Sequence, residues 1–280
     1  MGKRKLRYAS DSFGPLGKNH KHMFAAGSAL VDYPGNAIYS FIPKNGCTTM
    51  RLSLAIRNGC IDGPDQVHWV HANNSTFCAT LRELLTVDYT YVVLRCPFRR
   101  LASVFLDKIV GDKAPLEKLW NHAERQFDRE SITFTQFVAL LAESALRIDI
   151  HWRPQVDFLV YETYDAYFQL ERFGHVMEEV RRRTALQIVD ARNLTKHGIA
   201  HLQTIGAYAE HAHTPAHRVR EMKRSAVIPD PMSVYSEDTV EQVRRLYRDD
   251  LLLYAMRFGT EHLMFGEQWV DLEPKTRRFS

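Results

Sequence analysis

Two segments of the chain run from a short apolar stretch through a charged turn into a helical pattern. The first is IYSFIPKNGCTTMRLSL, residues 38–54, and its apolar part, 38–42, mixes β-branched and aromatic residues as a buried strand does. Apolar side chains recur over 48–57 with helical spacing, and Thr48 or Thr49 is suited to cap that helix. Backbone N–H groups converge at such a junction, the helix dipole favours negative charge, and Lys44 adds positive charge. The junction therefore predicts an anion-binding loop.

This loop is not a Walker loop. The Walker pattern places four residues between its glycines and then Gly-Lys and a hydroxyl, whereas here Lys44 precedes the only glycine, Gly46. On local sequence alone, an ordinary turn with a solvated lysine remains an alternative. The ligand we expect is phosphate-like, but not a Walker-type nucleotide triphosphate.

The second segment is YTYVVLRCPFRRLASVF, residues 89–105. Its first six residues are strongly β-biased, Arg95 follows them, and Pro97 ends the strand before a helical apolar pattern. If both apolar runs are parallel strands of one sheet, both junctions lie at the carboxyl ends of the strands, where open α/β sheets bind ligands. We therefore expect an α/β fold with a parallel sheet flanked by helices.

The rest of the chain predicts one domain, residues 26–280, preceded by a flexible basic N-terminal arm, residues 1–25. A third β-like run is DFLVY, residues 157–161, and residues 62–74 have the composition of a loop. Helices are expected over residues 76–85, 116–127, 134–147, 164–184 and 237–254.

Composition narrows the class of protein. The chain has 280 residues, of which 45% are hydrophobic and 25% charged, the balance of a soluble globular protein. A net charge of +4 is compatible with an anionic ligand and too weak to argue for nucleic acid. The four cysteines form no CxxC pair, no apolar run approaches a membrane span, and neither a signal peptide nor a myristoylation pattern is present. These features predict a cytoplasmic protein with reduced thiols.

Together the two junctions resemble the donor-binding elements of sulfotransferases that use 3′-phosphoadenosine 5′-phosphosulfate (PAPS). PKNGCTT resembles the family's Pro-Lys loop, which cradles the 5′-phosphosulfate, and RCPFRRLASVF resembles its Arg-x-Pro-Phe-x-Arg-Leu-x-Ser segment, which grips the 3′-phosphate. Cys96 stands where the family usually has Asp, and we do not expect this to remove the phosphate contact. The segments HWRPQVDFL, YETYDAY and LYRDDLLLY resemble the membrane-type carbohydrate branch, sulfotransferase family 2, so the likeness spans most of residues 36–255.

The resemblance implies a P-loop-like fold and in-line transfer of a sulfuryl group from PAPS to a hydroxyl group, of a glycan or glycolipid, without a metal. Lys44 would be catalytic, because charge grows on the leaving phosphate during transfer. The residues that the resemblance assigns to the donor site are Lys44, Asn45, Gly46, Cys47, Thr48, Thr49, Arg95 and Ser103.

A general base must take the proton of the acceptor hydroxyl, and histidine suits this role near neutral pH. His71 and His68 lie where related uronyl-type sulfotransferases place catalytic histidines. His71 is the first candidate for the base, His68 and His151 come next, and Glu162 is the last. For each histidine, a hydrogen-bonded structural role is the alternative. The histidine-rich stretch 197–217 has spacings that can bind metal, but we expect a polar loop that either faces the substrate or is mobile.

Two other functions remain open from the sequence. A P-loop-like kinase should show a Gly-Lys-Ser/Thr loop and an acidic residue that closes a strand, but YTYVVL ends in Arg95. A non-catalytic nucleotide-binding protein would keep the phosphate contacts and could do without Lys44 and a base. The acceptor and the oligomeric state are not specified by the sequence.

Overall fold

The computed structural model describes residues 4–10, 12–73, 75–192, 194 and 202–266. Its main sheet has the strand order β1-β2-β3-β4, and β2–β3 and β3–β4 pair in parallel while β1 is antiparallel to β2. The strands are Ala29–Asp32, Ala37–Ser40, Tyr89–Leu94 and Ala166–Gln169. The predicted strands at 38–42 and 89–94 are confirmed as neighbouring parallel strands, and the mixed α/β architecture is consistent with a P-loop-like fold.

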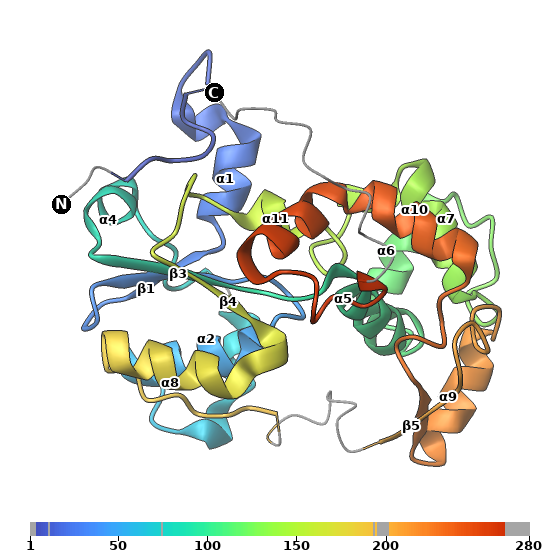
Figure 1. The fold of residues 1–280 in the computed structure, drawn as a ribbon. Helices are drawn as coiled ribbons and strands as arrows, with labels where there is room; N and C mark the ends of the chain where they lie inside the picture. Colours follow the sequence, from blue (N-terminus) through green and yellow to red (C-terminus); the bar gives the residue numbers. More distant parts are fainter. Residues whose placement is uncertain (1–3, 11, 74, 193, 195–201, 267–280) are drawn as a thin grey trace.

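Helices cover both faces of this sheet. In Figure 1, α2 (Cys47–Arg57) and α8 (Phe173–Thr184) lie below it, while α1 (His20–Ala26) and α4 (Leu81–Thr86) lie above. Along β3, Tyr91 and Val93 belong to one buried cluster, whereas Val92 and Leu94 belong to the other. Strands buried on both faces are near-continuously apolar, which explains the composition of YTYVVL.

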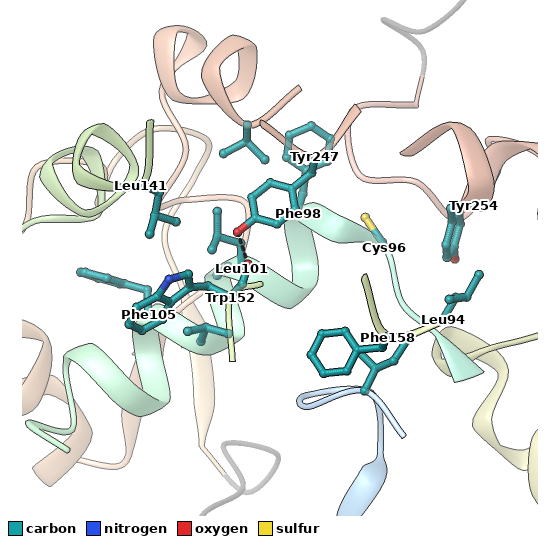
Figure 2. Close-up of a cluster of buried hydrophobic side chains, with 14 of the residues drawn as sticks. Leu94, Cys96, Phe98, Leu101, Phe105, Leu141, Trp152, Phe158, Tyr247 and Tyr254 are labelled. Carbon is teal, nitrogen blue, oxygen red and sulfur yellow. Dashed lines mark hydrogen bonds between the residues drawn. The ribbon is translucent and has the colours of Figure 1, made fainter. Parts of the chain in front are cut away.

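Most of the remaining helices gather beyond the carboxyl end of β3, on the right in Figure 1. They pack around an aromatic core that includes Phe98, Phe105 and Trp152 (Figure 2). These helices are α5 (Pro97–Val104), α6 (Ala114–His122), α7 (Phe134–Glu143), α9 (Ala216–Arg224), α10 (Glu237–Leu246) and α11 (Arg248–Phe258). A π-helical segment, Phe105–Ile109, continues α5, and α3 is the short helix Trp69–Ala72.

Smaller elements complete the fold. β5 (Gln203–Ile205) and β6 (Val227–Pro229) form a separate two-stranded parallel sheet. The 3-10 segments are Leu16–Lys18, Pro64–Gln66, Ala145–Arg147, Gln155–Phe158 and Leu170–Arg172. In the part of the chain described here, no helix has the length and apolar character that a membrane crossing requires.

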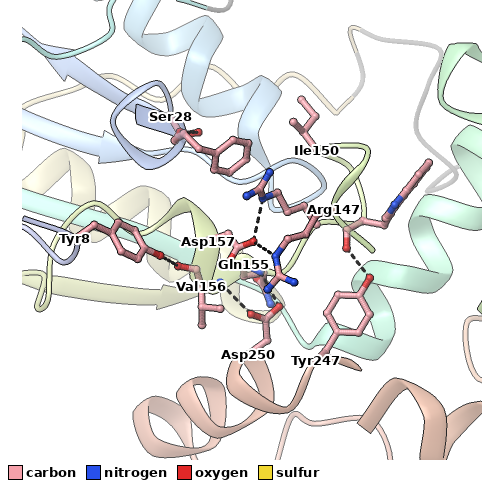
Figure 3. Close-up of polar contacts among 12 residues, drawn as sticks. Tyr8, Ser28, Arg147, Ile150, Gln155, Val156, Asp157, Tyr247 and Asp250 are labelled. Carbon is pink, nitrogen blue, oxygen red and sulfur yellow. Dashed lines mark hydrogen bonds and ion pairs between the residues drawn. The ribbon is translucent and has the colours of Figure 1, made fainter. Parts of the chain in front are cut away.

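The predicted third strand, 157–161, is wrong. Residues 155–158 form a 3-10 turn instead, because the Asp250 carboxylate accepts hydrogen bonds from the backbone N–H groups of Gln155 and Val156, at 2.7 and 2.9 Å (Figure 3). The third parallel strand is β4, which lies inside the predicted helix 164–184, and the helix starts only at Phe173. A short apolar run does not distinguish strand from helix by itself, and its pairing with β3 decides the outcome.

Several predicted helix boundaries also change. The helix expected over 237–254 is two helices separated at Tyr247, a buried residue whose hydroxyl donates to the Trp152 carbonyl (Figure 3). The helix expected over 76–85 begins only after Thr80, because Thr80 and Glu83 form a capping box. The helices expected over 116–127 and 134–147 end at His122 and Glu143.

The N-terminal segment, for which composition predicts a flexible arm, is packed onto the domain where it is described. Arg4 donates to the carbonyls of Val87 and Asp88, at 2.7 and 2.6 Å. Leu6 is buried, and on α1 the Phe24 ring lies 4.9 Å from that of Phe158. Composition alone does not show these contacts, because each partner lies far away in the sequence.

Candidate active site

The two predicted anion-binding junctions meet in one pocket of about 470 Å³. They meet because β2 and β3 are adjacent and parallel, so that their carboxyl ends lie side by side. Nine of the sequence-predicted site residues line this pocket: Lys44, Gly46, Cys47, Thr48, Thr49, His71, Arg95, Ser103 and His151. Asn45 and His68 do not belong to the lining.

Two arginines of the second junction hold the backbone of the first. Arg95 donates from Nη1 to the Lys44 carbonyl and Arg100 donates from Nε to the Pro43 carbonyl, both at 3.0 Å. Lys44 has a φ of 71°, a left-handed conformation that costs a residue with a Cβ about 1–2 kcal/mol. Strained backbone of this kind persists where its surroundings fix it, and it clusters at functional sites. The second junction therefore contributes the shape of the loop as well as positive charge.

Helix α2 begins in the pocket without a capping side chain. Its N-cap is Gly46, with a φ of 75°, and no side chain accepts a hydrogen bond from the first turn. The predicted cap by Thr48 or Thr49 is therefore wrong; the Thr49 hydroxyl accepts from the Ala191 N–H instead, at 3.0 Å. Uncapped N–H groups at a helix N-terminus form a ready site for an anion.

Asn45 supports the loop from behind. Its side chain is fully buried, and Nδ2 donates to the Val93 carbonyl at 2.9 Å and to Gln155 Oε1 at 2.6 Å. Gln155 in turn brackets the backbone of Arg95, accepting from its N–H at 3.0 Å and donating to its carbonyl at 2.9 Å. Asn45 thus ties the loop to β3 rather than presenting its side chain to a ligand.

Positive charge dominates the pocket lining. Among the described residues, the lining contains one carboxylate, that of Asp107, and five lysine or arginine side chains: Lys44, Arg51, Arg95, Lys108 and Arg192. Lys44 Nζ lies 2.9 Å from Asp107 Oδ2. Burial lowers the pKa of Lys44, and Asp107 opposes this shift. Burial likewise lowers the pKa of the Arg95 guanidinium, against the attraction of Glu171. Partly desolvated cations in such excess favour a polyanionic ligand.

His151 is held by a carboxylate at the pocket wall. Its Nδ1 lies 2.6 Å from Asp149 Oδ1, and the same oxygen accepts the His151 N–H at 2.9 Å. Burial alone raises the pKa of Asp149, but its contacts with His151 outweigh burial and lower it. A base oriented by a third group is the usual arrangement for proton transfer. The sequence reasoning missed Asp149, although the spacing IDIH places it two residues before His151.

The other predicted bases have different surroundings. His71 lines the pocket from the last turn of α3 and is exposed. His68 is exposed and outside the lining. Glu162 is also exposed and outside it, with its carboxylate 4.0 Å from Lys5 Nζ. The geometry therefore favours His151, with His71 second.

The segments that resemble the carbohydrate branch mainly build the frame of the site. Trp152 is buried and Asp250 fixes the 3-10 turn that carries Gln155 (Figure 3). In YETYDAY, Asp165 accepts from the backbone N–H and the hydroxyl of Thr90, at 2.7 and 2.9 Å. Cys96 is buried in the core shown in Figure 2, outside the pocket lining.

Part of the histidine-rich stretch, residues 197–201, lies outside the described residues. Within 202–217, His211 Nδ1 lies 3.2 Å from the Thr214 hydroxyl and His217 Nδ1 lies 3.1 Å from the Glu130 carbonyl. None of these described residues lines the pocket, so the pocket does not support the prediction that they contact a substrate. Across the described chain, no three His, Cys, Asp or Glu side chains are grouped as metal ligands.

Comparison with known proteins identifies the family. The sulfotransferase family profile matches residues 29–256, most of the chain, and the protein therefore belongs to the sulfotransferase family. Searches of curated proteins and of solved structures gave no significant match. Membership of this family supports an enzyme that transfers sulfuryl groups to a hydroxyl-bearing acceptor, and it favours this activity over the kinase alternative.

Proposed function

We propose that the protein transfers a sulfuryl group from PAPS to a hydroxyl group of a carbohydrate or glycoconjugate, with His151 as general base. The observation that carries this proposal is the pocket itself. It joins the uncapped start of α2 and Lys44 from one junction to Arg95 and Ser103 from the other, with the His151–Asp149 pair at its wall.

The lining fits a donor that carries two separate phosphate groups. The first turn of α2, the Thr48 hydroxyl and Lys44 would hold the 5′-phosphosulfate, because N–H donors and a cation converge there. Arg95 and Ser103 would hold the 3′-phosphate with a charged fork and a neutral donor. When bound, PAPS supplies a sulfuryl group on a phosphate that is a good leaving group.

His151 and Lys44 have separate roles in the transfer: His151 acts on the acceptor and Lys44 on the leaving phosphate. Asp149 keeps the proton of His151 on Nδ1, so Nε2 is free to take the proton of the acceptor hydroxyl as its oxygen bonds to sulfur. Lys44 stabilises the phosphate oxygen as its bond to the same sulfur breaks. No metal is needed, because the ammonium group and the backbone dipoles offset the developing charge.

A carbohydrate acceptor is supported by the likeness of three segments to the carbohydrate branch. His151 belongs to one of these segments and lines the pocket. The other two segments act in the frame of the site, so the choice of sugar would depend on other parts of the lining, among them His71, Ala191 and Arg192.

The test is a transfer assay. The purified protein is incubated with ³⁵S-labelled PAPS and a panel of glycans and small phenols, and products are identified by mass. We expect label in a sugar product, and Lys44→Ala should lower kcat on the order of 100-fold or more. Transfer only to phenols would contradict the acceptor class. Binding of PAPS with no transfer to any acceptor would favour the non-catalytic alternative, and phosphate transfer from labelled ATP would favour a kinase.

A further inference from the structure

Among the described residues that line the pocket, Asp107 alone has a carboxylate, and cations surround it in the lining. Its side chain is only 8% exposed and is contacted by three ammonium groups. Lys44 Nζ lies 2.9 Å from Oδ2, Lys108 Nζ lies 3.3 Å from the same oxygen, and Lys113 donates to Oδ1. A carboxylate opposes the binding of an anionic donor, so the presence of Asp107 in the lining of the anion site needs an explanation.

The π-helical segment brings Asp107 to this place. The Val110 N–H donates to the Phe105 carbonyl at 2.9 Å, five residues back, which widens the turn after α5. Phe105 and Ile109 stay in the core while Asp107 and Lys108 line the pocket. Such insertions into α-helices occur often at functional sites.

We propose that Asp107 is a positioning residue for Lys44: it holds the ammonium group charged and aimed into the pocket, and it releases that group to the leaving phosphate. This inference rests on the proposed function, which gives Lys44 its role. Because Lys108 and Lys113 contact the same carboxylate, Asp107 keeps two partners when Lys44 turns to the phosphate. The exchange therefore leaves no buried charge unpaired, which would otherwise be costly.

The charges around Lys44 explain why it needs this partner. Burial is the main influence that lowers the pKa of Lys44; Arg95 and Lys108 lower it further, and Asp107 raises it. The groups that face Asp107 are Lys44 and Lys108 in the pocket, Lys113 after the π segment, and Lys223 on α9. Burial alone raises the pKa of Asp107, but its lysine partners outweigh burial and lower it, so the carboxylate is ionised at neutral pH. Without the Asp107 carboxylate, Lys44 would lose its proton at a lower pH.

The test compares Asp107→Asn, Asp107→Glu and a matched control, Asp112→Asn. The control makes the same acid-to-amide change and removes the ion pair of Asp112 with Arg129. Asp112 lies outside the pocket lining, so the contact between Asp107 and Lys44 stays intact. We measure kcat against pH, the Kd for 3′,5′-bisphosphoadenosine, and the titration of Lys44 by NMR of ¹³C-labelled lysine. The Lys44 signal is assigned by its loss in Lys44→Arg.

For Asp107→Asn we expect kcat to fall on the order of 10- to 100-fold, less than for Lys44→Ala. The alkaline limb of the kcat profile and the Lys44 titration should both move to lower pH, while donor affinity stays within a few fold. Asp107→Glu should recover part of kcat, and Asp112→Asn should keep the wild-type kcat and the wild-type pH profile.

Two results would overturn the inference. One is an unchanged Lys44 titration in Asp107→Asn; the other is an equal loss of kcat in Asp112→Asn, which would show that the loss of a nearby ion pair, and not of the contact with Lys44, lowers kcat. Failure of the proposed function looks different, because the wild-type protein would then transfer no label from PAPS while the shift in the Lys44 titration would still be observed.

Discussion

Gly46→Ala tests whether close packing sets the conformation of the anion loop. Gly46 has a φ of 75°, and a Cβ there would lie 3.0 Å from Leu170 Cδ1 and 3.1 Å from Phe173 Cε2. Gly59 also has a φ of 75°, but a Cβ there would meet nothing within 4 Å. Gly59→Ala is therefore a matched control that carries the backbone cost without the contacts.

The expected losses follow from these two terms. The left-handed conformation costs a residue with a Cβ about 1–2 kcal/mol at either position. Replacing glycine by alanine also stabilises the protein by reducing the conformational entropy of the unfolded chain. This gain in stability is about the same at Gly46 and Gly59, so it cancels when the two variants are compared. Displacing the packed ends of Leu170 and Phe173 adds about 1–3 kcal/mol at Gly46 only. At about 2 °C per kcal/mol for a chain of this size, Tm should fall by about 4–10 °C for Gly46→Ala and about 2–4 °C for Gly59→Ala.

The assay is thermal unfolding of both variants, together with calorimetric titration of 3′,5′-bisphosphoadenosine. We expect Gly46→Ala to bind this ligand at least about tenfold more weakly, because moving the start of α2 displaces its N–H donors. Gly59→Ala should bind normally. Equal losses of Tm in the two variants would refute the packing argument, and normal ligand affinity in Gly46→Ala would refute the role of the loop backbone.

Four further predictions concern the ligand, the base, a buried carboxylate and metal. The protein should bind 3′,5′-bisphosphoadenosine far more tightly than AMP, since Arg95 and Ser103 would otherwise face no phosphate; comparable affinities by calorimetry would reject that assignment. His151→Ala should lower kcat about 100- to 10,000-fold with donor affinity nearly intact, whereas His68→Ala should keep wild-type kcat; the reverse result would move the base to His68. Burial raises the pKa of Asp250 to about 6, against two backbone N–H donors that lower it. The Asp250 carboxyl therefore binds a proton more tightly in the folded state than in the unfolded state. The stabilisation of the folded state by this proton is complete below about pH 3.8 and is lost as the pH rises through about 6. The free energy of unfolding of the wild type, relative to Asp250→Asn, should fall by about 2 kcal/mol between pH 4 and pH 7, since part of the full effect of 1.36 kcal/mol per unit of pKa is already lost at pH 4; a constant difference in urea titrations would contradict this. Transfer activity should survive EDTA, and its loss with recovery on added zinc would reopen the histidine-rich stretch as a metal site.

Local sequence was sufficient to predict the two strand–turn–helix junctions and their position side by side at one edge of the sheet. The run 89–94 is a strand with the predicted limits, and the order strand, turn, helix recurs after both strands. Parallel neighbours bring their carboxyl ends together, so Lys44 and Arg95 could be expected at the same edge of the sheet, and the resemblance to the family added Ser103. The two junctions depend on periodicity and on residue types within about 15 positions, which a sequence displays directly.

Contacts between distant residues decided the rest. The turn at 155–158 depends on Asp250, the loop conformation at Lys44 depends on Arg95 and Arg100, and β4 depends on its pairing with β3. Each of these outcomes overrides a local preference through hydrogen bonds that form only once the chain is folded.

The roles within the site divide in the same way. The residues of the donor site could be named from the sequence, because the resemblance to the family assigns them. The proposal of His151 as base in place of His71, and the placing of Asp107 against Lys44, could not be predicted, because a base and an ion pair are defined by distances of about 3 Å. Those distances are set by the packing of the π segment and of the turn around Trp152 against the helices beyond the sheet, where the Phe137 ring contacts both Phe105 and Trp152.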